Sequence, residues 1–271
     1  MKPVRPAAVA GAFYSGEPNT LAVGIAAMLE AAERHAEKPE SLPKAVIVPH
    51  AGYIYSGPVA ASAYALLRRG HSVYRRVVLL GPVHQVPVRG LALPDAEGFA
   101  TPLGMVPLDL DAMAMLADLP QVVQYDPAHT WEHSLEVQLP FLQTVLDNFK
   151  LVPLAVGDAT PQEVAEVLER LWGGPETLIV ISSDLSHFRP YHAAQQIDST
   201  TAQAILDLRW PVSHEQACGG TPVNGLLLAA RHHRLKPHLL DLRNSGDTAG
   251  DKSRVVGYGA FAFTEEPAHV H

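Results

Sequence analysis

The feature that most constrains the fold is a series of short, continuous apolar runs rich in β-branched residues. They lie at residues 44–49, 76–81, 150–157, 177–182, 238–242 and 257–263. Continuous runs of this kind are typical of strands that helices cover on both faces, whereas a half-solvated strand alternates polar and apolar residues. The runs therefore predict an α/β/α sandwich with a central mixed, largely parallel sheet.

Helical patterns lie between these runs. A proline opens the pattern at 58–69, a Thr-Pro pair opens those at 160–172 and 221–234, and Glu163 completes a capping box with Thr160. We expect further helices near 20–36, 109–118, 132–147 and 190–208, and a hairpin within the long excursion 82–108. With neither an internal repeat nor a linker composition, the pattern predicts one domain over residues 1–271.

Composition and charge exclude several classes of protein. The 271 residues are 47% hydrophobic and 18% charged, which is too apolar for intrinsic disorder. A net charge of −8 provides no broad basic surface, so nucleic acid and anionic membranes are disfavoured as partners. No run approaches the roughly 20 apolar residues of a membrane span, and the amino terminus lacks a secretion pattern. We therefore expect a cytoplasmic protein, with which the single cysteine, Cys218, agrees.

Titratable side chains follow three of the predicted strands. His50 follows 44–49, His84 follows 76–81, and Asp184 and His187 follow 177–182. Ligands of open α/β sheets bind beyond the carboxyl ends of the strands, where loops converge. One histidine at such a position is usually a hydrogen-bonded structural residue. Three of them on the same side of one sheet indicate a functional site.

Cys218 lies in the stretch "HEQACGGTPVNG", directly before the predicted helix 221–234. Unpaired N–H groups at a helix amino terminus favour the thiolate, which is the nucleophilic and metal-binding form of cysteine. Cys218 is therefore a candidate metal ligand or reactive thiol. The alternative is a small residue that packs at a tight turn.

The segment "HTWEHSLEVQLPFL" at 129–142 carries a further group of polar residues. On a helix, Glu132 and Glu136 are four residues apart and His133 and Glu136 three, so an acidic and imidazole face would point to the open end of the sheet. These residues, with Tyr53, are candidates for contacting a substrate or supporting metal ligands. The alternative is a capped helix with solvated carboxylates.

These segments together resemble the Memo family. The resemblance is carried by "VPHAGYIYSG", "LLGPVH", "EHSLEVQLPFL", "SSDLSHF" and "CGGTPVNG", in this order between residues 48 and 225, and by "GYGAF" near the carboxyl end. It implies the fold of the class III extradiol dioxygenases, which bind non-haem Fe(II) through two histidines and a glutamate. By the same resemblance His50, His84 and Cys218 would be metal ligands, and Asp184 and His187 would be the acid/base pair.

The resemblance leads to three functional hypotheses. The first is a metal-dependent, dioxygenase-like oxidoreductase that acts on a small or peptide-borne aromatic substrate. Fe(II) is the expected metal, with Cu or Zn as alternatives because a thiolate ligand is soft. The second is an adaptor that binds phosphotyrosine-containing peptides without turnover, and the third is a hydrolase in which the metal activates water.

The resemblance also bears on partners and on the amino-terminal segment. Prokaryotic relatives are often encoded with a radical-SAM protein and a third protein, in the AmmeMemoRadiSam system, which implies a shared pathway. We also expect the amino-terminal "GAFYSG" to cover part of the sheet near the site.

Overall fold

The largest element of the structure is a nine-stranded mixed sheet. The structure is a computed structural model and describes residues 2–34 and 39–265. In spatial order the strands are β10 (His187–Arg189), β12 (Val255–Thr264), β2 (Pro43–Val48), β9 (Thr177–Ser182), β3 (Arg76–Pro82), β8 (Lys150–Val156), β4 (Leu91–Leu93) and β7 (Val122–Gln124), and β11 (Lys236–Asn244) also pairs with β12.

Parallel pairing is concentrated in the centre of this sheet. The pairs β2–β9, β9–β3 and β3–β8 are parallel, and so is β4–β7. The pairs β10–β12, β11–β12, β12–β2 and β4–β8 are antiparallel. The predicted mixed sheet is confirmed, with its parallel character strongest in the middle. Every residue of β2 and β9 is buried, which explains why these strands read as continuous apolar runs.

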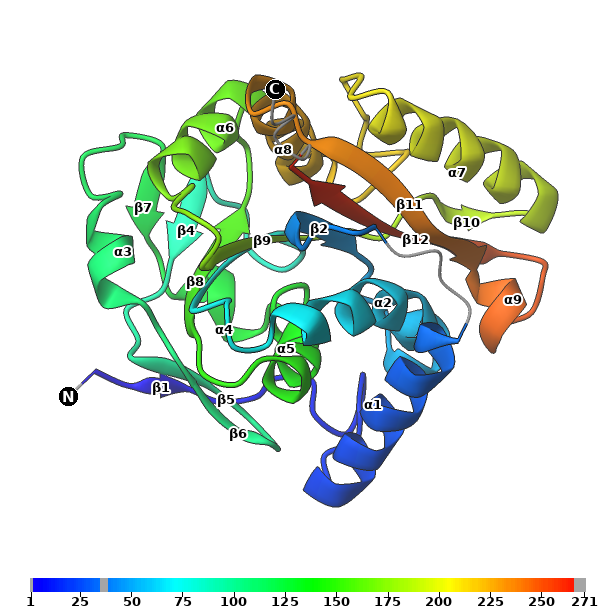
Figure 1. The fold of residues 1–271 in the computed structure, drawn as a ribbon, viewed down its shortest axis with the longest axis horizontal. Helices are drawn as coiled ribbons and strands as arrows, with labels where there is room; N and C mark the ends of the chain where they lie inside the picture. Colours follow the sequence, from blue (N-terminus) through cyan, green and yellow to red (C-terminus); the bar gives the residue numbers. More distant parts are fainter. Residues whose placement is uncertain (1, 35–38, 266–271) are drawn as a thin grey trace.

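Helices cover both faces of the sheet, which confirms the predicted sandwich (Figure 1). One layer contains α1 (Pro18–Glu33), α2 (Tyr53–Leu67) and α5 (Leu139–Val145), and the other contains α6 (Pro161–Arg170), α7 (Tyr191–Leu206) and α8 (Gly220–His232). Sheet and helices share one hydrophobic core. The connections contain the short helices α3 (Leu110–Ala114), α4 (Pro127–Thr130) and α9 (Ser245–Thr248) and the 3-10 turns η1 (Arg68–Gly70) and η2 (Glu136–Gln138). None of the described helices combines the length and apolarity that crossing a membrane requires.

A small second sheet contains the hairpin predicted between residues 82 and 108. Its strands are β5 (Gly98–Thr101) and β6 (Gly104–Pro107), which are antiparallel, and β1 (Val4–Arg5), which runs parallel to β5. The strands β1, β4, β7 and β10 have no counterpart in the sequence prediction. Each is only two or three residues long, too short to produce a recognisable hydrophobic period.

Three helix predictions are wrong in their bounds. The helix expected near 109–118 covers only Leu110–Ala114 and is followed by turns. The helix expected at 58–69 begins at Tyr53, so that Pro58 lies in its interior. The helix expected at 132–147 begins as a non-helical turn and becomes α-helical only at Leu139, with Pro140 in the first turn. A proline fits the first turn of a helix, where its missing N–H would have no partner. The predicted capping box of Thr160 and Glu163 is present at α6.

Candidate metal centre

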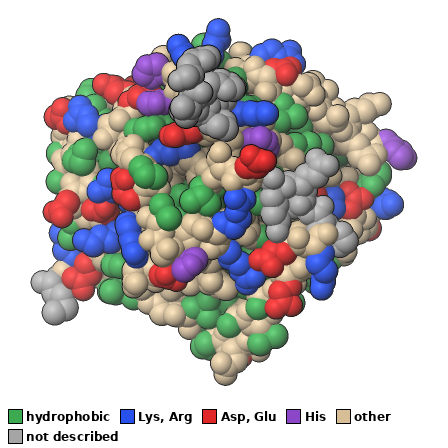
Figure 2. Space-filling view, in the orientation of Figure 1, with side chains coloured by type: hydrophobic (Ala, Val, Ile, Leu, Met, Phe, Trp, Pro, Cys, Tyr) green, Lys and Arg blue, Asp and Glu red, His purple; other side chains and the backbone are tan. Residues whose placement is uncertain are grey.

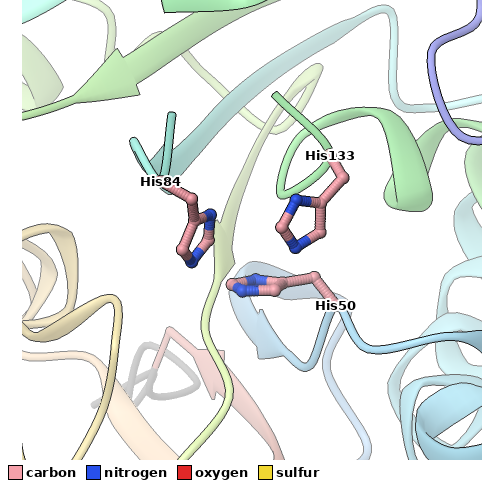
Figure 3. A group of neighbouring side chains, drawn as sticks. All are labelled: His50, His84 and His133. Carbon is pink, nitrogen blue, oxygen red and sulfur yellow. The ribbon is translucent and has the colours of Figure 1, made fainter. Parts of the chain in front are cut away.

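Three adjacent parallel strands bring the histidines of the predicted site together. His50 follows β2 and His84 follows β3, and β9 lies between these two strands and is parallel to both. His133, from the turn before η2, completes the group (Figure 3). One nitrogen of each of these three rings lies within 4.8 Å of the others. Imidazole nitrogens at this spacing could hold a metal ion.

The hydrogen bonds of His50 determine which of its nitrogens is free. Its Nδ1 lies 2.9 Å from Oγ of Ser182. That hydroxyl donates its single proton to the carbonyl of Ser134 at 2.6 Å and accepts an N–H from Gln138 at 2.8 Å. The hydroxyl must therefore accept from Nδ1–H of His50, which leaves the lone pair on Nε2. Burial, and then the neighbouring imidazoles, lower the pKa of His50 far below its usual range, so the ring is neutral.

Glu132 holds His84 as Ser182 holds His50, through a hydrogen bond to Nδ1 of the ring. Its Oε1 lies 2.8 Å from Nδ1 of His84, and its Oε2 accepts the backbone N–H of the same residue at 2.5 Å. Because a carboxylate only accepts, Nδ1 of His84 carries a proton, and Nε2 is the nitrogen that a metal ion could bind in place of a second proton. Oε1 also accepts the backbone N–H groups of His133 and Ser134, each at 2.9 Å. A carboxylate behind an imidazole is the usual support of a metal-binding histidine.

Opposing effects set the pKa values of this pair. Burial alone would raise the pKa of Glu132, but the hydrogen bond and charge of His84 and the backbone N–H groups outweigh it and lower the pKa to about 2. Burial would likewise lower the pKa of His84, and the bond and charge of Glu132 raise it instead. Glu132 is therefore a buried, permanently charged group beside the three rings.

Cys218 lies next to His50, with Sγ 3.4 Å from Nε2 of that ring. It is outside the group of His50, His84 and His133, whose ligand atoms all lie within 4.8 Å of one another. It precedes α8, as predicted, but the expected stabilisation of its thiolate is wrong. Burial, and then the charge of Asp184, raise the pKa of the thiol to about 12. The N–H groups at the start of α8 do not compensate for this desolvation. The neutral thiol is therefore the favoured form of Cys218.

Asp184 and His187 lie together beside His50. Oδ1 of Asp184 accepts the backbone N–H of His50 at 2.7 Å, and Oδ2 lies 4.0 Å from Nε2 of His187. Nδ1 of His187 donates to the carbonyl of Leu185 at 2.9 Å, so Nε2 is the nitrogen that can accept a proton. Burial raises the pKa of Asp184. The imidazole and the carboxylate are therefore close to each other, but at 4.0 Å they do not form a hydrogen bond.

Glu136 does not have the position that was expected for it. Because residues 131–135 are not helical, Glu132 and Glu136 share no helix face. Glu136 is fully buried, forms an ion pair with Arg5 and accepts the hydroxyl of Tyr14 at 2.6 Å. It holds the amino-terminal segment against the body of the protein. In that segment the Phe13 ring lies 4.6 Å from the His133 ring, so "GAFYSG" reaches the neighbourhood of the site.

Tyr53 also departs from the prediction. Its hydroxyl donates to the carbonyl of Val137 at 2.7 Å, and its ring packs against Phe141 in the core. The helical turn that begins at Tyr53 carries the side chain inward. Its position is that of a packing residue, and a contact with substrate is not supported.

An open pocket of about 490 Å³ adjoins the candidate ligands. His84 and Cys218 form part of its wall, and the polar residues Asp158 and His214 form another part. Apolar side chains supply most of the remainder: Val83, Val86, Val88 and Val156. The volume and the mixed lining suit a small organic molecule.

Several residues of the centre were not predicted in these roles. His133 was expected near a substrate, and it lies within the ligand group itself. Ser182 and Gln138, which position His50, were not predicted at all. The sequence does contain one sign of the role of Gln138, which is a polar residue between the apolar residues Val137 and Leu139. In the structure this side chain is 1% exposed, and a buried polar group needs hydrogen-bond partners.

Fold and site together define an α/β sandwich protein with a candidate metal centre at the carboxyl ends of its parallel strands. The Memo family, described as Memo-like protein, matches residues 5–262. MEMO1 family proteins of Metallosphaera sedula, Sulfolobus acidocaldarius and Ignicoccus hospitalis are 34%, 35% and 36% identical to the chain. These matches cover 95%, 96% and 96% of this chain and 98%, 99% and 98% of the relatives. The chain therefore belongs to the Memo family.

The chain is also similar to solved structures. The crystal structure of an uncharacterized Escherichia coli K12 protein aligns with a TM-score of 0.49 and 15% sequence identity. The alignment covers 80% of this chain and 98% of that one.

Proposed function

We propose that the protein is a metal-dependent oxidoreductase whose metal is held by His50, His84 and Cys218, with His133 beside them. The observation that carries this proposal is the tautomer of two rings. Ser182 and Glu132 accept Nδ1–H of His50 and His84, so Nε2 of each ring is left for the centre. A histidine with a merely structural role has no need of a free, buried nitrogen next to a thiol.

The donor set fits a redox metal. Two to three imidazoles and a soft thiolate suit iron(II), copper or zinc, and we propose iron(II). The ion, when bound, would supply redox chemistry and polarise the substrate. The pocket beside His84 and Cys218 would receive a small or peptide-borne aromatic substrate. Asp184 and His187 would then take a proton from its hydroxyl group and return it to the product.

The adaptor alternative receives less support from the site. A phosphotyrosine side chain carries close to two negative charges, and phosphate sites generally provide arginine forks. The pocket presents the carboxylate of Asp158, and Glu132 adds a second negative charge close to the imidazoles. Both would repel a phosphate group.

Metal content and oxygen consumption test the proposal. After anaerobic reconstitution with Fe(II), we expect about one iron per chain in the wild type. The variant His50→Ala/His84→Ala should lose it, whereas His71→Ala, which removes an exposed imidazole elsewhere, should not. Equal iron content in the double variant and the wild type would contradict the metal centre.

A second measurement separates the oxidoreductase from the hydrolase. Oxygen uptake by the iron-loaded protein is followed with a panel of catechols, and Asp184→Asn and His187→Gln serve as matched variants. Uptake that depends on iron and falls in both variants supports the oxidoreductase. Hydrolysis of ester substrates without oxygen uptake would favour the hydrolase.

A further inference from the structure

A second group of metal-binding side chains lies away from the site already described. Glu169 is near the end of α6, His232 is the last residue of α8, and His233 follows it. One ligand atom of each residue lies within 4.8 Å of the others. Oε1 of Glu169 is 2.9 Å from Nδ1 of His232, and Oε2 is 2.8 Å from Nε2 of His233. One carboxylate thus faces two imidazoles from a neighbouring helix.

Local packing holds this group in place. The ring of His233 stacks on Trp172 with a centroid distance of 3.7 Å and an interplanar angle of 7°. Trp172 in turn accepts a hydrogen bond from Lys44 through its backbone carbonyl. Because the stacked ring cannot rotate freely, Nε2 of His233 stays directed at Glu169. Only His232, whose side chain is 72% exposed, keeps substantial freedom.

The position at the end of α8 favours a cation. The last carbonyl groups of a helix carry partial negative charge, and His232 and His233 lie directly at this end. The carboxylate of Glu169 adds a full negative charge between the two rings. On the molecular surface, histidine atoms lie beside acidic side chains over α6, where an ion can enter from solvent (Figure 2).

We propose that Glu169, His232 and His233 form a second metal site for a divalent transition ion such as Zn²⁺, Ni²⁺ or Cu²⁺. One carboxylate oxygen and two imidazole nitrogens would be the protein ligands, and water would complete the coordination. The ion would occupy the place of the hydrogens that join the imidazoles to the carboxylate. It would also link α6 to α8, which already pack against each other.

Another surface pair provides the control. Nδ1 of His71 lies 2.8 Å from Oδ2 of Asp147, and both side chains are about half exposed. This pair has the same chemistry as one half of the proposed site, but it is not among the three-residue groups of the described chain. A metal that bound to any exposed histidine–carboxylate pair would also bind here.

Copper binding tests the proposal in a protein whose central site is disabled. The background variant is His50→Ala/His84→Ala/Cys218→Ser, titrated with Cu²⁺ against a chromophoric chelator and examined by electron paramagnetic resonance. We expect about one tight ion per chain, with hyperfine splitting from two nitrogens. Adding His232→Ala or His233→Ala should weaken this binding by more than about tenfold, and adding His71→Ala should leave it unchanged.

Other outcomes overturn the proposal. Unchanged affinity in both His232→Ala and His233→Ala would do so. So would loss of the tight ion on replacing His269 and His271 in the carboxyl-terminal stretch. If the background variant does not fold, the wild type is loaded with Zn²⁺ and counted by mass spectrometry of the native protein. The proposal then requires that His232→Ala/His233→Ala lowers the count by one, and an unchanged count refutes it.

Discussion

The buried cluster around His50 and the surface cluster around Glu169 both contain histidines and a glutamate but use them differently. In the buried cluster, Ser182 and Glu132 accept Nδ1–H of His50 and His84, and the Nε2 atoms are left to face the centre. In the surface cluster, Glu169 itself contacts one nitrogen of each ring. The first cluster is oriented by the protein whether or not an ion is bound. The second needs a proton or a metal ion between its members.

Burial explains why the two clusters differ. The side chain of Glu132 is 1% exposed, whereas that of Glu169 is 35% exposed. A buried charge without partners is very costly, so Glu132 must be surrounded by donors for the chain to fold. A carboxylate at the surface is solvated by water and needs no such network. The contacts of the buried cluster therefore contribute to the free energy of unfolding, whereas the contacts of the surface cluster contribute little to it.

The largest expected effect is on stability. Glu132→Ala should lower the free energy of unfolding by about 3–5 kcal/mol, because it leaves buried backbone N–H groups and His84 without their acceptor. Glu169→Ala should lower it by less than about 1 kcal/mol. Urea denaturation of both variants, without added metal, measures the difference. Similar losses in the two variants would contradict the comparison.

The pH dependence of stability sharpens this prediction. The pKa of Glu132 is lowered from its usual value of 4.5 to about 2 in the folded protein. A lowered pKa means that the charged form stabilises the fold at pH values above about 4.5 and that this contribution is lost as the pH falls towards 2. It amounts to roughly 3 kcal/mol. In Glu132→Gln, unfolding experiments between pH 7 and pH 3 should show a shallower loss of stability than in the wild type.

The next effect concerns the reactivity of Cys218. Since its pKa is raised to about 12, the thiolate fraction at pH 7 should be about 3,000-fold smaller than for a thiol with the ordinary pKa of about 8.5. A more basic thiolate is more nucleophilic, which offsets part of this loss, so the metal-free protein should react with iodoacetamide about 100-fold more slowly. Mass spectrometry over time, with glutathione as the reference thiol, measures the rate. A rate equal to or above that of glutathione would mean that the thiolate is stabilised without a metal.

A supporting residue should affect metal affinity more moderately. Ser182→Ala removes the acceptor of Nδ1–H of His50 without touching a proposed ligand. We expect the affinity for Fe(II) to fall by about 10- to 100-fold, as is typical when the partner of a metal-binding histidine is lost. Competition with a chelator measures it, and Ser62→Ala, which removes a buried hydroxyl that donates to Asp241 outside the centre, is the control. An unchanged affinity would show that Ser182 does not orient the ring.

The sequence was sufficient to predict which strand ends meet. Continuous apolar runs before His50, His84 and Asp184 predicted buried strands, and neighbouring parallel strands must end at the same edge of the sheet. That argument needs no knowledge of side-chain orientation. It therefore succeeded for the sandwich and for the proximity of these residues.

The sequence was not sufficient to predict which way a side chain points where the local backbone geometry decides this. Helical periodicity placed Glu132 and Glu136 on one face, but the turn at residues 131–135 directs Glu132 to His84 and Glu136 to Arg5. The pKa of Cys218 likewise depends on burial by residues far away in the chain. A helix amino terminus alone does not reveal that burial.

The smallest expected effect lies in the surface cluster. Without metal, His232→Ala should change the free energy of unfolding by less than about 0.5 kcal/mol, because its side chain is largely exposed and solvent screens its contact with Glu169. His71→Ala, which removes the corresponding contact with Asp147, should behave alike. Chemical denaturation in the presence of a strong chelator makes this comparison. In the His50→Ala/His84→Ala/Cys218→Ser background, saturating Zn²⁺ should then raise the stability. Adding His71→Ala should preserve this gain and adding His232→Ala should remove it, since only an ion bound to the folded state stabilises it. If His232→Ala without metal lowered the free energy of unfolding by more than about 2 kcal/mol, the surface cluster would be needed for folding, as we expect for Glu132. That result would contradict the comparison.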